Sequence, residues 1–258
     1  MKIQSRLVIA GAVRDDAPWL PAIFKNIAAI SDLFLSTACI FVESDSSDNS
    51  LELLNEFKNS RPDVEVICLG KLQPTVFELA QRVAIARNTY LDLIESKYSD
   101  YDLLLILDMD YINSDPVNIE GLLSNFKYTD WDMICANQKG FHVDLWALRH
   151  PELMPHDCWE KTHNSFPLTF DAAKRLFVDR RIYFKETDPI IQVQSAFGGS
   201  GFVKISSIKG ARHEGLANGK HVCEWISFCR KLNEGKAKIY INPAFINYTT
   251  RNRPVKVL

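Results

Sequence analysis

The stretch Leu103-Leu104-Leu105-Ile106-Leu107-Asp108-Met109-Asp110 decides how this chain folds. Five aliphatic residues without a polar break are typical of a strand in a parallel sheet, because both faces of such a sheet are covered. We therefore expect a buried strand over residues 103–107. The two carboxylates that follow are expected where the chain leaves the core.

Three further strands are predicted upstream, and helical patterns separate all four. The predicted strands cover residues 7–13, 39–42 and 64–69, and the predicted helices cover residues 18–27, 51–57 and 78–95. This order predicts an α/β fold with an open, mostly parallel twisted sheet flanked by helices. Ligands of such sheets bind beyond the carboxyl ends of the strands. The acidic runs after Val42 and Leu107 are both expected at that edge.

The second half of the chain is less regular, and residues 140–185 carry no assignable pattern. We predict a strand over residues 131–137, a strand, glycine turn and strand over 192–203, a helix over 224–232 and a short strand over 239–243. No repeat, low-complexity stretch or linker-like composition divides the chain. Residues 1–258 are therefore expected to form one domain with an elaborated C-terminal half.

Composition and charge exclude several classes of protein. The 258 residues include 30 basic and 32 acidic ones, which gives a net charge of −2 and no basic stripe of the kind that nucleic acids require. We see no apolar run of membrane-spanning length and no signal-peptide core. The six cysteines form no C-x-x-C pair and lie mostly in apolar runs, which favours reduced, buried thiols. We expect a soluble cytoplasmic protein that binds no nucleic acid and has no membrane span.

The pair Asp108 and Asp110 is the first candidate for chemistry. Two neighbouring carboxylates repel each other unless a cation offsets their charge. Mg²⁺ and Mn²⁺ prefer such hard oxygen ligands and take others from substrate phosphates. We expect either ion here, with Asp110 as the more direct ligand. On the bare tripeptide, two solvated acids at the end of a strand are the plainer interpretation.

Four segments in chain order change that balance. They are the loop Val42-Glu43-Ser44-Asp45-Ser46-Ser47-Asp48-Asn49-Ser50, the Ala86-Arg87-Asn88 step that precedes Asp-x-Asp, the glycine stretch Ser195-Ala196-Phe197-Gly198-Gly199-Ser200-Gly201, and the run from Cys223-Glu224-Trp225 to Ile241-Asn242-Pro243. Together they resemble GT-A glycosyltransferases. The set is most similar to the cryptococcal capsule-associated mannosyltransferase family. Trp225 departs from that family, which typically has a histidine there.

The resemblance implies a GT-A-type single domain that moves a hexose from a nucleotide-sugar donor to a glycan or glycolipid acceptor. It favours mannose and GDP-mannose, and a UDP-sugar is the other possible donor. It also implies that residues 1–115 bind the nucleotide-sugar and residues 116–258 bind the acceptor. The expected cofactor is Mn²⁺ or Mg²⁺.

Roles for individual residues follow from the same resemblance. Glu224 and Asp110 are the expected catalytic residues, and Asp108 and Asp110 the expected metal ligands. One of His213, His221 or Asn247 is expected to complete the metal site. The residues expected to bind the donor are Arg14, Glu43, Asp45, Arg87, Asn88, Asp108, Gly199 and Ser200.

Each role has a plainer alternative. Glu224 also suits the first turn of a helix, where an acid complements the macrodipole. Asn88 also suits a role in holding a loop below the metal. The glycines at 198, 199 and 201 also suit a hairpin turn. Five aromatic residues between 140 and 185 suit either a sugar-stacking wall or a core: Trp146, Trp159, Phe166, Phe170 and Phe177.

Three other functions remain open at this point. An inverting, family-2-like UDP-sugar transferase would use Glu224 as a general base, whereas the mannosyltransferase resemblance implies retention. A non-catalytic nucleotide- or carbohydrate-binding module would keep the cleft without the reaction. An aspartate-nucleophile phosphatase fits less well, because Ile112 stands where its motif has threonine and the motif does not follow the first strand.

Overall fold

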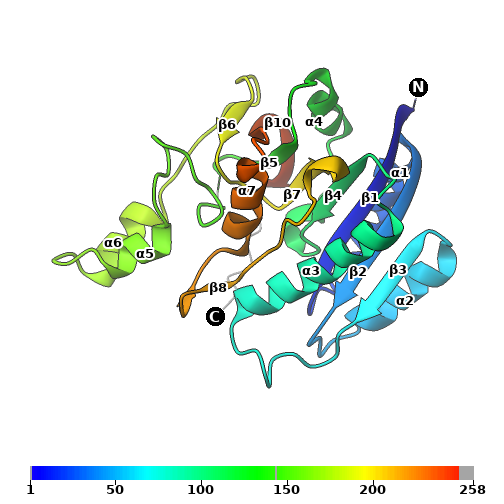
Figure 1. Ribbon diagram of the computed structural model, residues 1–258, viewed down its shortest axis with the longest axis horizontal. Coiled ribbons are helices and arrows are strands. Elements are labelled where there is room, and N and C mark those ends of the chain that lie inside the picture. Colours follow the sequence, from blue (N-terminus) through cyan, green and yellow to red (C-terminus); the bar gives the residue numbers. More distant parts are fainter. Residues whose placement is uncertain (1, 143, 250–258) are drawn as a thin grey trace.

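The computed structural model describes residues 2–142 and 144–249, without the side chains of residues 248 and 249. Within these residues, an eight-stranded sheet has the strand order β3-β2-β1-β4-β7-β5-β10-β6. Figure 1 shows this sheet with helices around it. Its strands are β1 (Ile3–Val13), β2 (Phe34–Glu43), β3 (Val64–Cys68), β4 (Leu103–Leu107), β5 (Met133–Lys139), β6 (Ile191–Val193), β7 (Ser200–Lys204) and β10 (Ile239–Thr249).

The sheet is mostly parallel, as the sequence predicts. Strands β3, β2, β1 and β4 all pair in parallel, and β10 pairs in parallel with β5. Strand β7 is antiparallel to both β4 and β5, and β6 is antiparallel to β10. The predicted strand, glycine turn and strand over 192–203 is present, but β6 and β7 do not pair. Strands β5 and β10 lie between them, so the hairpin alternative for the glycine turn is wrong.

The main helices are α1 (Leu20–Ser31), α2 (Ser50–Ser60), α3 (Leu79–Lys97) and α7 (Glu224–Glu234). Shorter ones are α4 (Ile119–Ser124), α5 (Cys158–His163) and α6 (Phe170–Phe177), and β8 (Leu216–Ala217) pairs with β9 (Lys220–His221). Helices α5 and α6 lie in the segment that the sequence left unassigned. None of the described helices is long and apolar enough to cross a membrane.

Alternate residues of β1 build the core on the two faces of the sheet. Leu7 and Ile9 belong to one buried cluster, which includes the apolar stripe of α1. Val8 and Ala10 belong to the other, which includes the buried faces of α3 and α7. All four β1 side chains are fully buried. Each buried Leu, Ile or Val contributes roughly 1.5–3 kcal/mol relative to its exposed state, so this three-layer packing holds the strand ends in place.

Strand β10 is longer than the predicted strand over 239–243. Its pairing with β5 shifts register between Ile241 and Ile246, in the part that contains Pro243. Proline has no N–H to donate and is tolerated in a sheet where the ladder is already interrupted. The Asn242 amide donates to Ser124 Oγ and Asn125 Oδ1 beside this irregular segment. The strand therefore continues past the proline.

Candidate active site

A cleft of about 680 Å³ opens where β1 and β4 end. Its wall comes from the loop after β1, the turn after β4, the first half of α3 and the start of α7. This volume is in the range of pockets that hold small-molecule ligands and cofactors. The charged residues on its wall are Arg14, Asp15, Asp16, Arg82, Arg87, Asp108, Asp110 and Glu224. The cleft lies at the sheet edge that the strand pattern predicts.

The turn after β4 presents Asp108 and Asp110 to this cleft. Met109 between them is 1% exposed, and its side chain fills the space beside Gly11, where a Cβ would lie 2.5 Å from it. The Asp108 N–H donates to the Gly199 carbonyl at 2.9 Å. Asp110 Oδ1 accepts from the Ile112 N–H at 3.0 Å and caps a short 3₁₀ turn. Packing and hydrogen bonds therefore hold both aspartates in the predicted pair.

Arg87 links two acids that come from opposite halves of the chain. Its Nη1 donates to Glu224 Oε1 at 2.7 Å, and its Nη2 donates to Asp108 Oδ1 at 3.0 Å. The Arg87 side chain is 6% exposed and that of Glu224 is 10% exposed. Ionic hydrogen bonds of this kind are stronger than neutral ones. Arg87 therefore fixes the start of α7 against the Asp-x-Asp turn.

Two aromatic rings pack against the Arg87 guanidinium. Its guanidinium carbon lies 4.5 Å from the Trp225 ring centre and 5.0 Å from that of Phe197. Trp225 and Phe197 stack on each other at 3.9 Å. Such contacts attract a cation, more strongly where water is excluded. Trp225, at the position where the family that the sequence resembles typically has a histidine, thus packs against a cation. An indole ring is no ligand for a hard metal ion.

Burial raises the pKa of Asp108 well above the usual aspartate range. Arg87 opposes this rise, whereas the charges of Asp110, Asp144 and Glu224 add to it. The Asp108 side chain still exposes 31% of its surface, so water in the cleft limits the effect. Burial also raises the pKa of Glu224, again opposed by Arg87. Burial is therefore the main reason that both carboxyl groups bind a proton more readily than free ones, and Arg87 limits the effect on each.

Asp144 is a residue of this region that sequence reasoning missed. Its Oδ2 accepts from the Gly198 N–H at 2.9 Å, and its charge acts on both Asp108 and Glu224. It falls in the segment 140–185, where no pattern marked it. Only the fold brings it beside the glycine turn.

The residues expected at the nucleoside end divide into two groups. Arg14 lines the cleft and its Nη2 donates to Gln73 Oε1 at 3.3 Å. Glu43 and Asp45 are buried and are not among the lining residues. Glu43 accepts from the Ser46 N–H at 2.9 Å and the Cys68 thiol at 3.0 Å. These local hydrogen bonds hold the loop after β2 in place.

Asp45 supports the same loop. Its Oδ1 accepts from the Gln73 N–H at 2.9 Å, and its Oδ2 lies 3.6 Å from Arg82 Nε. Arg82 also donates to the carbonyls of Val76 and Phe77 at 2.8 and 2.7 Å. Sequence reasoning did not single out Arg82, although it lies on the same predicted helix as Arg87. Ser44, between the two acids, does line the cleft.

Asn88, Gly199 and Ser200 were expected to bind the donor, but the structure places them among supporting contacts. The Asn88 amide exchanges two hydrogen bonds of 2.9 Å with the backbone of His213, which favours the loop-holding alternative. The Gly199 carbonyl accepts from Asp108 N–H and from the Asn113 amide. Ser200 Oγ donates to Asn113 Oδ1 at 3.1 Å. None of the three expected residues lines the cleft.

The candidates for a third metal ligand also have other partners. His213 is 2% exposed, stacks on Phe228 at 4.6 Å, and its Nδ1 lies 3.1 Å from the Glu224 carbonyl oxygen. Burial lowers its pKa well below the usual range, which makes it a neutral core imidazole. His221 Nε2 lies 2.8 Å from Glu78 Oε2. The Asn247 amide donates to the Gly198 carbonyl and Ser200 Oγ at 2.7 and 2.8 Å.

The donor set of Asp108 and Asp110 nevertheless fits a divalent cation. Both offer hard oxygens on the cleft wall, and such oxygens are the ligands that Mg²⁺ prefers. No three His, Cys, Asp or Glu side chains within residues 2–142 and 144–249 gather into a metal site. Mg²⁺ is usually bound through one or two carboxylates together with substrate phosphates and water. The two aspartates match that mode of binding.

Comparison with known proteins gives similarity in structure alone. No family model matches this chain, and no curated protein matches it in sequence. Mannosyltransferase PcManGT from Pyrobaculum calidifontis, solved with GDP-Man and Mn²⁺, superposes with a TM-score of 0.56 over 98% of this chain at 11% identity. S. aureus TarS 1–349, solved with UDP-GlcNAc, superposes with a TM-score of 0.55 over 96% at 12% identity. The chain spans 59% of the length of each of these two.

A mycobacterial protein is also similar, with a TM-score of 0.51, 15% identity and coverage of 97% of this chain and 69% of its own. The finer resemblance to the cryptococcal capsule-associated mannosyltransferase family is not confirmed by these comparisons. At these identities, similarity establishes the fold and leaves the chemistry to the residues of the cleft. The mostly parallel sheet, its flanking helices and these neighbours identify the fold of this chain as that of the GT-A glycosyltransferases.

Proposed function

We propose that this chain is a glycosyltransferase that uses a nucleotide-sugar and a divalent metal ion, Mn²⁺ or Mg²⁺. One observation carries the proposal: Arg87 joins Asp108 and Glu224 on the wall of one cleft. A transferase that inverts the sugar's configuration needs a site for the leaving diphosphate and, next to it, a base for the acceptor hydroxyl. The proposal assigns Asp108 and Asp110 to the first site and Glu224 to the second.

The diphosphate end of the cleft is proposed to use charge of both signs. Asp108 and Asp110 would hold the metal ion, which neutralises charge on the departing diphosphate when it is bound. Arg14 and Arg82 also line the cleft, and a guanidinium can bind phosphate oxygens through two parallel hydrogen bonds. These residues would keep the donor oriented while its sugar bond breaks.

Glu224 is proposed as the residue that receives the acceptor's proton. The acceptor O–H bond breaks as its oxygen bonds to the anomeric carbon, the proton passes to the Glu224 carboxylate, and the bond from that carbon to the diphosphate oxygen breaks. Burial raises the pKa of Glu224, which improves a carboxylate as a proton acceptor near neutral pH. Arg87 holds its Oε1 and so fixes the direction of the carboxylate.

The donor sugar and the acceptor are finer parts of the proposal. A hexose, with mannose favoured, is supported by the sequence resemblance and by the mannosyltransferase among the structural neighbours. A UDP-sugar is the alternative, supported by the neighbour solved with UDP-GlcNAc. Residues 1–115 are proposed to bind the donor and residues 116–258 to bind a glycan or glycolipid acceptor.

Thermal unfolding with GDP-mannose and UDP-sugars, with and without Mn²⁺, tests the donor site. A ligand that binds the native state raises stability by about 2.7 kcal/mol at 100 times its dissociation constant. We expect a shift that needs both donor and Mn²⁺ and that is lost in Asp110→Asn. The matched control is Asp130→Asn, because Asp130 is an exposed surface acid. If no donor shifts the unfolding temperature with Mn²⁺ present, the proposal is wrong.

Hydrolysis of the donor separates an enzyme from a binding module. We expect slow Mn²⁺-dependent release of nucleoside diphosphate by the wild-type chain and none by Asp110→Asn. Binding without turnover in both proteins would favour the non-catalytic alternative. With an acceptor in hand, NMR of the new glycosidic bond decides between inversion, which suits a Glu224 base, and the retention that the sequence resemblance implies.

A further inference from the structure

Arg87 is shared between two acids to which the proposed function gives different partners. Its Nη2 bonds Asp108, a proposed metal ligand, and its Nη1 bonds Glu224, the proposed base. The planar guanidinium thus reaches both sites through separate N–H groups. Its Nε is buried and has no hydrogen-bond partner among the described residues. The hydrogen bonds of this guanidinium therefore go to the two acids.

Packing holds the guanidinium where it is. The rings of Trp225 and Phe197, which lie 4.5 and 5.0 Å from its central carbon, are themselves 2% and 1% exposed. The Arg87 side chain is 6% exposed. A side chain in a closely packed interior has no empty space into which it can turn. We therefore expect a change of charge at one acid to be felt at the other through Arg87, without displacement of its side chain.

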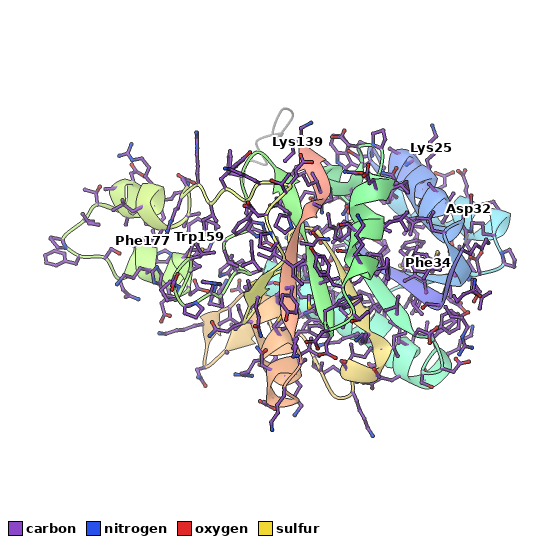
Figure 2. The ribbon with its side chains drawn as sticks, turned by 90° about the horizontal axis from the view of Figure 1, so that it is seen from above. Lys25, Asp32, Phe34, Lys139, Trp159 and Phe177 are labelled. Carbon is purple, nitrogen blue, oxygen red and sulfur yellow. The ribbon has the colours of Figure 1, made fainter. Side chains whose placement is uncertain are left out.

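The charges around this cleft come from the body of the molecule. Figure 2 shows the segment of α5 and α6, in which Trp159 and Phe177 are labelled, projecting from that body, and none of the described residues of these two helices lines the cleft. Helices α3 and α7, which carry Arg87 and Glu224, pack against each other. Arg87 lowers the pKa of Glu224 and that of Asp108. It is therefore a cation common to both carboxyl groups.

We propose that Arg87 couples the metal site to Glu224, so that filling the metal site strengthens the hold of Arg87 on Glu224. This inference rests on the metal site of the proposed function. A divalent ion at Asp108 and Asp110 would compete with Arg87 for the charge of Asp108, and two positive charges repel each other. The charge of Glu224 offsets that of Arg87 and so favours metal binding. Because coupling between sites is reciprocal, a bound metal ion would in turn fix Glu224 more firmly for the acceptor.

Titration with Mn²⁺ alone, followed by the electron paramagnetic resonance signal of the free ion, tests this coupling. Glu224→Gln keeps the shape of the side chain and an oxygen that can accept from Arg87, but it removes the charge. We expect this variant to bind Mn²⁺ at least about fivefold more weakly than the wild type, which is the lower end of typical couplings between sites. Arg87→Met should bind Mn²⁺ more tightly than the wild type, because the competing cation is gone. The double variant Arg87→Met/Glu224→Gln should lie between the two single variants, because it loses one charge of each sign.

The matched control is Glu234→Gln, because Glu234 is an exposed acid at the other end of α7 and pairs with Lys231. This variant should bind Mn²⁺ as the wild type does. Circular dichroism and the unfolding temperature show which variants are folded, and Glu224→Gln tests the coupling by itself if Arg87→Met does not fold. Equal affinity of the wild type and Glu224→Gln would overturn the coupling. Weaker Mn²⁺ binding by folded Arg87→Met would also overturn it, since a purely structural role of Arg87 predicts that result. If the wild type binds no Mn²⁺, the proposed metal site is itself wrong, and the coupling fails with it.

Discussion

Arg87→Met is the most informative perturbation of the cleft. Methionine keeps much of the side-chain volume above Trp225 but removes the charge that bonds Glu224 at 2.7 Å and Asp108 at 3.0 Å. Removing one partner of a buried ion pair typically costs 3–5 kcal/mol, because the other charge stays buried without compensation. For a chain of this size, that corresponds to a fall of roughly 6–20 °C in the unfolding temperature.

The loss should depend on pH, and its sign follows from Glu224. The pKa of Glu224 is already raised above the ordinary value of 4.5 in the folded protein, and Arg87 is the main influence that holds it down. Without Arg87 that pKa rises further. A group whose pKa is higher in the folded protein than in the unfolded chain stabilises the fold at pH values below its unfolded-state pKa. That contribution is lost as the pH rises through its folded-state pKa. The variant should therefore be less impaired at pH 5 than at pH 7.5.

Urea unfolding of the metal-free protein at the two pH values measures this. The exposed pair of Arg212 with Asp92 and Glu95 supplies the control, since Arg212→Met should cost at most about 1 kcal/mol. The double variant Arg87→Met/Glu224→Gln should recover part of the loss, because the uncompensated charge is gone. A loss below 1 kcal/mol for Arg87→Met, or a larger loss at pH 5 than at pH 7.5, would refute this reasoning.

Three further predictions concern the supporting contacts. Gly199 has φ +85°, and an added Cβ would lie 2.3 Å from Ile112 Cγ2, whereas Gly210 has φ +69° and open space around it. Both alanine variants should lose about 1–3 kcal/mol of stability to backbone strain, and Gly199→Ala should lose more because of the clash. Equal urea midpoints of the two variants would contradict the clash. Asn88→Ala should lose about 1–3 kcal/mol of stability. Its affinity for the donor, measured by calorimetry, should stay within about twofold of the wild type, or about 0.4 kcal/mol. A large loss of affinity would show that Asn88 binds the donor after all. Cys68 is the exposed one of the six free thiols, so a thiol reagent should label one cysteine in the native protein and none in Cys68→Ser; labelling of the others would show that their burial is wrong.

The parallel half of the fold could be read from local patterns. Uninterrupted apolar runs at residues 7–13 and 103–107 became β1 and β4, because side chains of such runs are stable only when both sheet faces are covered. Asp108 and Asp110 were predicted together since they are two residues apart. The segment 140–185 could not be read, because α5 and α6 are short and their apolar residues are divided between core and surface.

The role of several candidate site residues depends on their hydrogen-bond and packing partners and not on their residue type. Glu43 is the last residue of β2 and Arg14 directly follows the neighbouring β1, yet Glu43 is buried among the bonds of its own loop and Arg14 lines the cleft. His213 and His221 differ as strongly, one stacked in the core and the other beside Glu78. Residue type allows each role, whereas the hydrogen bonds that select one depend on which backbone groups the fold places nearby.

Local sequence determined where β1 and β4 end and that two carboxylates follow β4, because hydrophobic burial acts on runs of neighbouring residues. Tertiary structure alone decided that Arg87 meets Glu224, 137 residues away, and that Asp144 reaches the Gly198 N–H. Those contacts depend on the insertion of antiparallel β7 between β4 and β5 and on the packing of α7 against α3. Register and packing between distant elements set them, and no local pattern carries that information.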